Sequence, residues 1–228
     1  MPRIKERVLP NTFYARDPRL VARELLGKVL VRTLSSRAGA QRLSGKIVEV
    51  EVYLGEGDLA AHSAAGKTAR NEVLFGPPGH AYVYFIYGAH YCLNFSCLPE
   101  GQAGCVLLRA IEPLEGIEAM AKARGISRER LHSTSGLRLL TSGPGRVCEA
   151  LTITRERLNG QELYRAQSPL KIVDDGARPD EIGESTRIGI TKSPEMPLRY
   201  FIPGNDFVSG KRNHLITETP SIRRQAKG

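Results

Sequence analysis

Hydrophobic and polar residues alternate along several short segments of this chain, whereas few segments have the spacing of a helix. The clearest alternation is GKIVEVEVYLG, residues 45–55, where the pattern is strict from Val48 onward. Successive side chains of a strand point to opposite faces, so the valines share one face and Glu49, Glu51 and Tyr53 share the other. The segment therefore predicts a strand with one buried face, and solvent exposure is the simplest interpretation for Glu49.

One segment carries the complete signature of a helix. In DPRLVARELLG, residues 17–27, Asp17 can cap the N-terminus, Pro18 suits the first turn and Gly27 can end the helix. Weaker patterns predict strands over 28–34, 105–113, 185–191 and 198–202, a helix within 112–125, and a helix start within 141–151. No strand–helix–strand rhythm repeats. We therefore expect an α+β fold: one domain over residues 1–228, its core at about 10–210, with a curved, mostly antiparallel β-sheet, surrounding helices and a protruding β-hairpin.

Three segments show neither pattern. Residues 35–45 resemble a polar loop, 55–80 a long irregular loop broken by Gly and Pro, and 173–183 a surface loop. A loop as long as 55–80 in a compact domain is usually functional or disordered. The basic tail after Lys211 is expected to fray.

The chain has 228 residues, a net charge of +9 and a pI of about 9.6. Such a charge favours a polyanionic partner, nucleic acid first and an acidic membrane surface second, although a well-solvated basic surface would look the same. No apolar run is long enough to cross a membrane, and the N-terminus has no apolar secretion segment. We therefore expect a cytoplasmic, DNA-associated protein that is not secreted.

The four cysteines are expected to be reduced thiols in such a protein. Three of them, Cys92, Cys97 and Cys105, lie near His90 and invite a zinc site. Their spacing is not that of a zinc motif, and Cys92 and Cys97 would point to opposite faces of a strand. The sequence therefore predicts no metal.

Aromatic residues are concentrated in AYVYFIYGAHYCLNFS, residues 81–96. Two alternating runs flank Tyr87-Gly88, which predicts a β-hairpin with its tip there and a positive φ at Gly88. Cross-strand packing explains Phe85 and Phe95 well but leaves a ring at the tip unexplained. An aromatic wedge on a basic protein suggests insertion between DNA base pairs.

Four motifs follow one another in the chain: IVEVEVYLGEGDLAAHS, YVYFIYGAHYCLN, CVLLRAIEPLEG and LTSGPG. With them the chain closely resembles the alkyladenine, or 3-methyladenine, DNA glycosylase family over about residues 10–210. The resemblance implies a single-domain fold of helices and strands without metal or organic cofactor. It also implies hydrolysis of the bond between a damaged purine and deoxyribose in double-stranded DNA, which leaves an abasic site during base excision repair. A monomer is expected, because recognition of one nucleotide does not require a dimer.

The resemblance also assigns roles to individual residues. Glu51 takes the place of the general base, and Arg109 that of an arginine that helps to hold the nucleotide phosphate and the water. The other assignments are Tyr53 and Tyr84 (rings that stack on the flipped base), His62 (contact with the base), Asn94 (an amide that disfavours guanine), Ile188 (a carbonyl that helps to hold the water) and Tyr87 (the intercalating tip). Residues 62–70 and 88–91 depart from the family's pattern, which puts the lesion preference in doubt.

The chemistry of these residues agrees with that function. An ionised Glu51 could stabilise positive charge at C1′ and deprotonate water, and the planar fork of Arg109 could hold a carboxylate or a phosphate. A lyase would need an amine nucleophile, and the matched motifs contain no lysine, so we predict a monofunctional hydrolase. The turn before the helix start could bring Gly143, Gly145 and Arg146 to a DNA phosphate.

Three alternatives accompany this interpretation. The aromatic hairpin could belong to a non-catalytic nucleic-acid-binding module, and Arg109 could form a structural ion pair. A carbohydrate hydrolase could use Glu49 and Glu51, but glycosidases need carboxyl groups on either side of a bond, and these two share one strand face.

Overall fold

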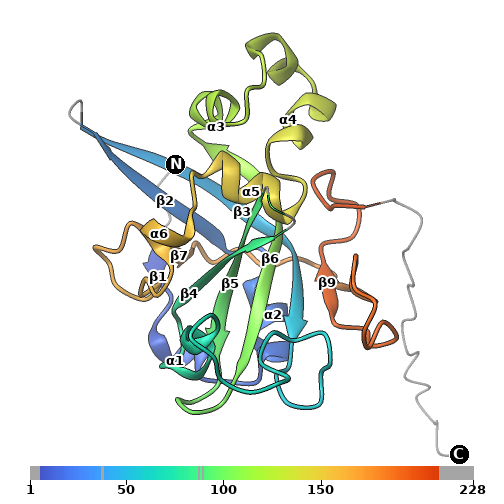
Figure 1. Ribbon diagram of the computed structural model, residues 1–228. Coiled ribbons are helices and arrows are strands. Elements are labelled where there is room, and N and C mark those ends of the chain that lie inside the picture. The colour runs from blue at the N-terminus through green and yellow to red at the C-terminus, as the bar shows by residue number, and fades with distance from the viewer. Residues whose placement is uncertain (1–5, 37–38, 87, 89, 211–228) are drawn as a thin grey trace, which may run out of the picture.

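An antiparallel β-sheet forms the centre of the computed structural model, which describes residues 6–36, 39–86, 88 and 90–210 (Figure 1). Its strands are β1 (Arg7–Val8), β2 (Val29–Ser36), β3 (Gly39–Tyr53), β4 (Ala81–Ile86), β5 (His90–Cys97), β6 (Gly104–Glu115), β7 (Leu170–Asp174), β8 (Gly183–Ser185) and β9 (Arg199–Phe201). The main path runs β1-β7-β2-β3-β6-β5-β4, and β9 pairs with β3 and β8. Every strand pair among the described residues is antiparallel, which confirms the predicted α+β class.

Short helices surround the sheet. In the described part of the chain they are α1 (Asn11–Tyr14), α2 (Pro18–Leu25), α3 (Ile117–Ala123), α4 (Thr134–Thr141), α5 (Pro144–Ala150), α6 (Arg155–Leu158) and the 3₁₀ helices η1 (Glu72–Phe75) and η2 (Arg128–His132). Helix α2 confirms the clearest prediction, because a carboxylate oxygen of Asp17 accepts a hydrogen bond from the Arg19 N–H at 2.8 Å and Gly27 has a φ of +85°. Helix α3 begins later than expected because β6 continues to Glu115.

The polar loop predicted for residues 35–45 is wrong, because β2 and β3 continue through this region as a two-stranded ribbon. The register pairs Thr33 with Arg42 and Ser36 with Gly39. Figure 1 shows this hairpin extending beyond the rest of the sheet. Because its outer end has no apolar face to bury, polar residues occupy both faces and the alternation that marks a strand is missing.

The segment predicted as a strand over 185–191 is mostly irregular. Only Ser185 belongs to β8, and Gly189 has a φ of +77° that a strand does not adopt. Residues 55–80 form the long irregular loop that was expected, with η1 inside it. Both segments lie beside the same part of the sheet and contribute to the site described below.

Strand β3 contains an irregularity that its regular alternation does not reveal. Its register against β6 shifts on both sides of Glu49, as at a β-bulge. Ile47 and Val50 therefore reach the main hydrophobic core, whereas Val48 packs in a separate cluster with Ala110. The expected exposure of Glu49 is wrong, because this side chain has no exposed surface at all.

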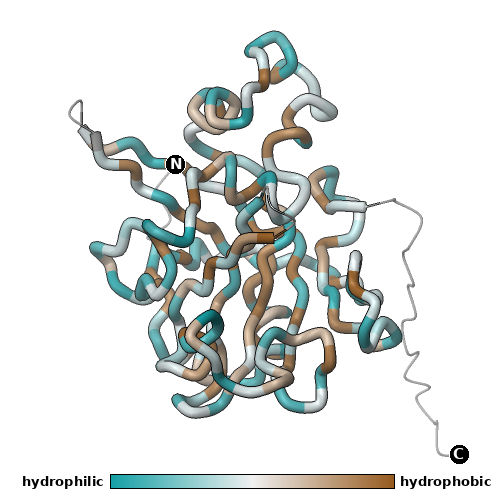
Figure 2. Tube along the Cα trace, in the orientation of Figure 1, coloured by the Kyte–Doolittle hydropathy of each residue, from teal (hydrophilic) through white to brown (hydrophobic). Residues whose placement is uncertain are grey.

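The two faces of β4, β5 and β6 hold different side chains, because successive residues of a strand alternate between faces. On one face Val83, Leu93 and Val106 belong to the main hydrophobic core. The opposite face carries a second cluster made of Leu74, Tyr82, Tyr84, Cys92, Cys105 and Leu107. Figure 2 shows that hydrophobic positions are frequent along these central strands. The fold thus leaves a sheet face of mixed aromatic and apolar side chains available for a site.

Candidate active site

Cross-strand pairing places the candidate residues in one row. Glu51 on β3 lies opposite Leu107 on β6, Leu107 lies opposite Asn94 on β5, and Asn94 lies opposite Tyr82 on β4. Tyr84 follows two residues after Tyr82 and therefore points to the same face. Residues from separate parts of the sequence thus share one sheet face.

A cavity of about 360 Å³ opens on this face. Its lining includes eight of the predicted site residues, namely Glu51, Tyr53, His62, Tyr84, Asn94, Arg109, Gly145 and Ile188. Apolar side chains such as Leu74 and Ile86 complete much of the wall. Small-molecule pockets typically combine apolar walls with a few well-placed polar groups. The structure therefore brings together most of the residues that the sequence singled out.

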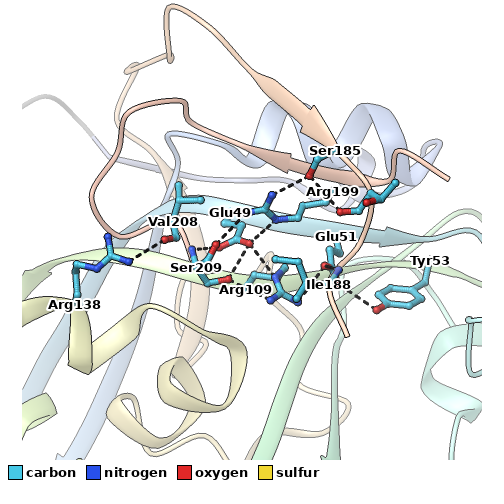
Figure 3. Close-up of polar contacts among 11 residues, drawn as sticks. Glu49, Glu51, Tyr53, Arg109, Arg138, Ser185, Ile188, Arg199, Val208 and Ser209 are labelled. Atoms are coloured by element: carbon cyan, nitrogen blue, oxygen red, sulfur yellow. Dashed lines mark hydrogen bonds and ion pairs between the residues drawn. The ribbon is translucent and has the colours of Figure 1, made fainter. Parts of the chain in front are cut away.

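Glu51 lies at the edge of this cavity with no exposed surface, and its carboxylate has three partners (Figure 3). The guanidinium of Arg109 lies 3.0 Å away, the Ile188 backbone N–H donates at 2.7 Å, and the Tyr53 hydroxyl donates at 3.2 Å. Burial raises the pKa of Glu51 above the usual glutamate value, although Arg109 and the Ile188 N–H act in the opposite direction. A carboxylate in this state is suited to accept a proton.

The guanidinium of Arg109 contacts two carboxylates and one hydroxyl. Its Nε donates to Glu49 at 2.9 Å, one terminal nitrogen lies 3.0 Å from Glu51, and the other donates to the Ser209 hydroxyl at 3.2 Å. Burial alone would lower the pKa of Arg109, but the two carboxylates raise it, so the side chain stays charged. The sequence left open whether Arg109 holds a carboxylate or a phosphate, and the structure shows it in contact with carboxylates.

Several rings line the cavity, among them His62, Tyr82 and Tyr84. His62 packs edge-on against Tyr84 with 4.4 Å between ring centroids, and its Nδ1 lies 3.0 Å from the Tyr82 hydroxyl. Partial desolvation and then the charge of Arg70 lower the pKa of His62, so this ring is neutral near pH 7. Burial raises the pKa of Tyr82 to about 12, so its hydroxyl keeps its proton as well. The walls of the cavity therefore carry little charge apart from Glu51 and Arg109.

Two hydrogen bonds hold the Asn94 side chain in the middle of the row. Its amide nitrogen donates to the Tyr82 carbonyl at 3.2 Å, and its amide oxygen accepts a weak bond from the Cys105 thiol at 3.8 Å. The side chain is buried yet borders the cavity. A polar amide at this point can discriminate between ligands by the groups on their edges.

Two other predicted residues, Gly143 and Arg146, are not among the described residues that line the cavity. Tyr87 lies outside the described residues, although β4 ends at Ile86 and β5 begins at His90, and Gly88 between them has a φ of +67°. The hairpin tip is therefore where it was predicted, and intercalation stays a prediction. Gly143 precedes α5, and Arg146 donates to the Ser142 carbonyl at 3.4 Å. Their contact with phosphate also stays a prediction.

Sequence reasoning missed two groups of buried charges beside the cavity. Glu49 accepts hydrogen bonds from Arg199 at 2.7 Å and from the Ser209 hydroxyl at 2.9 Å. Asp58 forms a bidentate ion pair with Arg187 at 2.6 Å and 2.9 Å. Each partner lies more than a hundred residues away along the chain, so no local pattern reveals these pairs.

The described residues hold no group of three or more His, Cys, Asp or Glu side chains that could bind a metal. All four cysteines are free and buried, with Cys92 and Cys97 in different hydrophobic clusters. Within the same ranges no helix is long and apolar enough to cross a membrane. What the structure offers is an aromatic cavity in which a flat ligand could stack beside a proton-accepting carboxylate. This is the class of site that a DNA glycosylase requires.

Comparison with known proteins points to the same class. The family model described as methylpurine-DNA glycosylase matches residues 12–206. The chain is 60% identical over 204 residues to a protein of Koribacter versatilis, with 90% of this chain and 94% of the relative covered. Identity is 43% over 210 residues with a protein of Burkholderia lata (92% and 94% covered) and 43% over 205 residues with one of Methanoculleus marisnigri (88% and 98% covered). Each of the three is named "Putative 3-methyladenine DNA glycosylase".

The chain belongs to the methylpurine-DNA glycosylase family. Family membership confirms the predicted enzyme class, a hydrolase of DNA repair that acts on alkylated purines. It argues against a non-catalytic binding module. The carbohydrate hydrolase alternative also loses its second carboxylate, because Glu49 is held by two arginines and does not line the cavity.

Proposed function

We propose that this protein is a monofunctional DNA glycosylase that turns a damaged purine out of the double helix and hydrolyses its N-glycosidic bond. The main support for this proposal is the position of the Glu51 carboxylate, which is buried at the edge of an aromatic cavity and has a raised pKa. A base cannot be reached inside the stacked duplex, so the nucleotide must rotate out before it can enter such a cavity.

In the cavity the everted base would lie against Tyr53 and Tyr84. Contact with an aromatic ring contributes about 1–3 kcal/mol per base, and a cationic alkylated purine gains further from the negative ring faces. Asn94 would meet one edge of the base and neutral His62 another. These contacts favour flat, electron-poor purines over normal bases.

For the reaction itself, Glu51 accepts a proton from water while the water oxygen bonds to C1′. The electron pair of the glycosidic bond leaves with the base, and a neutral base takes up a proton as it departs. Positive charge develops on the sugar during this step, as in other glycoside hydrolyses, and the ionised carboxylate stabilises it. Arg109 and the Ile188 N–H keep the carboxylate in place without neutralising it fully.

A covalent lyase route would need a lysine amine near C1′. Among the described residues that line the cavity there is no lysine, which supports simple hydrolysis. The net charge of +9 suits binding to the DNA backbone through counterion release. Insertion of Tyr87 into the vacated position, phosphate contacts by Gly143, Gly145 and Arg146, a monomeric state, a single-domain organisation and a cytoplasmic location remain part of the proposal.

The test uses duplexes that each carry one lesion: 3-methyladenine, 7-methylguanine, hypoxanthine or ethenoadenine. The purified protein should release at least one of these bases, and the product strand should break only after alkali treatment. Strand breakage without alkali would contradict the monofunctional assignment. Failure to release any of the four bases would contradict the glycosylase function.

A further inference from the structure

Behind the cavity lies a buried ion pair that the reaction does not use directly, formed by Asp58 and Arg187 and here called the Asp58–Arg187 pair. Two guanidinium nitrogens of Arg187 contact the two carboxylate oxygens of Asp58 at 2.6 Å and 2.9 Å. Neither side chain has any exposed surface. Burial would raise the pKa of Asp58, but the hydrogen bonds from Arg187 hold it below the usual value, so both groups stay charged.

The guanidinium of Arg187 covers one face of the Tyr53 ring. Its central carbon lies 4.7 Å from the ring centroid, within the range of a cation–π contact. Tyr53 lines the cavity, whereas Arg187 does not. An incoming base therefore meets the face of the ring opposite the arginine. A bare cation at that position would repel a cationic base and would compete with it for the electrons of the ring.

We propose that the Asp58–Arg187 pair determines lesion specificity: Asp58 cancels the charge of Arg187 behind Tyr53 and so lets the front of the ring accept a positively charged purine. This inference rests on the proposed function. Both residues are positioning residues, because neither reaches the cavity. The arginine gives Tyr53 a rigid planar support, and the aspartate removes the electrostatic penalty of that support for a cationic ligand.

The same pair also joins three segments of the wall. Asp58 accepts hydrogen bonds from the N–H groups of Leu54 and Ala60, both at 3.1 Å. Arg187 donates to the Val52 carbonyl at 3.0 Å, and the next residue, Ile188, donates its N–H to Glu51. Breaking the pair could therefore disturb the geometry of the site, and the experiment has to separate charge from geometry.

Two single substitutions separate the effect of charge from the effect of geometry. Each substitution breaks the pair, and the charges that the two variants leave behind have opposite signs. Asp58→Asn leaves a cation behind Tyr53, and Arg187→Gln leaves an anion there. The measurement is the single-turnover release rate of cationic 7-methylguanine divided by that of neutral hypoxanthine, from otherwise identical duplexes. We expect this ratio to fall about three- to tenfold in Asp58→Asn and to rise in Arg187→Gln. A purely geometric role would move the ratio the same way in both variants or leave it unchanged, and either result overturns the inference.

A matched control is Asp174→Asn, which breaks the partly buried Lys28–Asp174 pair (3.1 Å) away from the cavity. It should lower the unfolding temperature without changing the ratio. If one variant misfolds, the other still tests the inference, because a rise of the ratio in Asp58→Asn or a fall in Arg187→Gln overturns it. The ratio is also measured without turnover, as relative binding of the two duplexes in a Glu51→Gln background. Absence of release by the wild type contradicts the proposed function, whereas an unaltered binding ratio contradicts this inference.

Discussion

Two carboxylates on β3, Glu49 and Glu51, are separated by a single residue in the sequence and yet have different environments. Both are fully buried and both contact Arg109. Glu49 also contacts Arg199 and receives the backbone N–H and hydroxyl of Ser209. Glu51 has Arg109 as its one guanidinium partner in the described structure, together with one N–H and one phenol, and it faces the cavity. Figure 3 shows that both carboxylates contact the guanidinium of Arg109, which lies between them.

The difference shows how one residue type can serve two purposes within a single strand. Arg109 and Arg199 together with the backbone N–H and hydroxyl of Ser209 occupy both carboxylate oxygens of Glu49. Glu51 receives less compensation than its burial demands, and its pKa rises. A base must also reach the water that it deprotonates, and of the two carboxylates only Glu51 lines the cavity. We infer that Glu49 holds the arginines and that Glu51 performs the chemistry.

The largest expected effect comes from Glu51→Gln, which keeps the shape of the side chain and removes the base. Release of hypoxanthine should slow about 10³-fold, since general base catalysis typically contributes 10²- to 10⁴-fold. Affinity for the same duplex should stay within a few-fold of the wild type, because the phosphate contacts are untouched. Single-turnover rates and binding isotherms give the two quantities. A comparable rate loss in a correctly folded Glu49→Gln variant would contradict the inference that Glu51, and not Glu49, performs the chemistry.

The next largest effect concerns stability. Glu49→Gln leaves Arg109 and Arg199 buried with less negative charge, which should lower the free energy of unfolding by about 3 kcal/mol. Glu51→Gln should leave that free energy unchanged or raise it. Because the folded-state pKa of Glu51 is raised, its ionised form opposes folding at neutral pH, and a neutral side chain removes this penalty. Denaturant unfolding at pH 7 measures both, and the reverse order of stabilities would refute the argument.

The sequence predicted the site better than it predicted the surroundings of the site. Alternation in β4, β5 and β6 was sufficient to place Tyr82 and Tyr84 on one face, because period-two spacing is a local property of the chain. The burial of Glu49 depends on a β-bulge and on Arg199, which lies 150 residues further along. The hairpin of β2 and β3 was missed for the opposite reason, since it buries too little to leave a hydrophobic pattern. Long-range charge pairs and exposed ribbons are both invisible to periodicity.

The smallest expected effect is on the pH dependence of hypoxanthine release, which tests whether Glu51 is the residue that must be ionised. Because Glu51 must be ionised to act, the rate should rise with pH, and the midpoint should lie above the usual glutamate pKa. The Tyr53 hydroxyl stabilises the ionised carboxylate, so Tyr53→Phe should move this midpoint further up and slow release several-fold below it. Tyr82→Phe is the matched control, because it removes a hydroxyl that contacts His62 instead of Glu51 and should leave the midpoint in place. A midpoint that moves in Tyr82→Phe but not in Tyr53→Phe would mean that His62, and not Glu51, governs the rate at low pH.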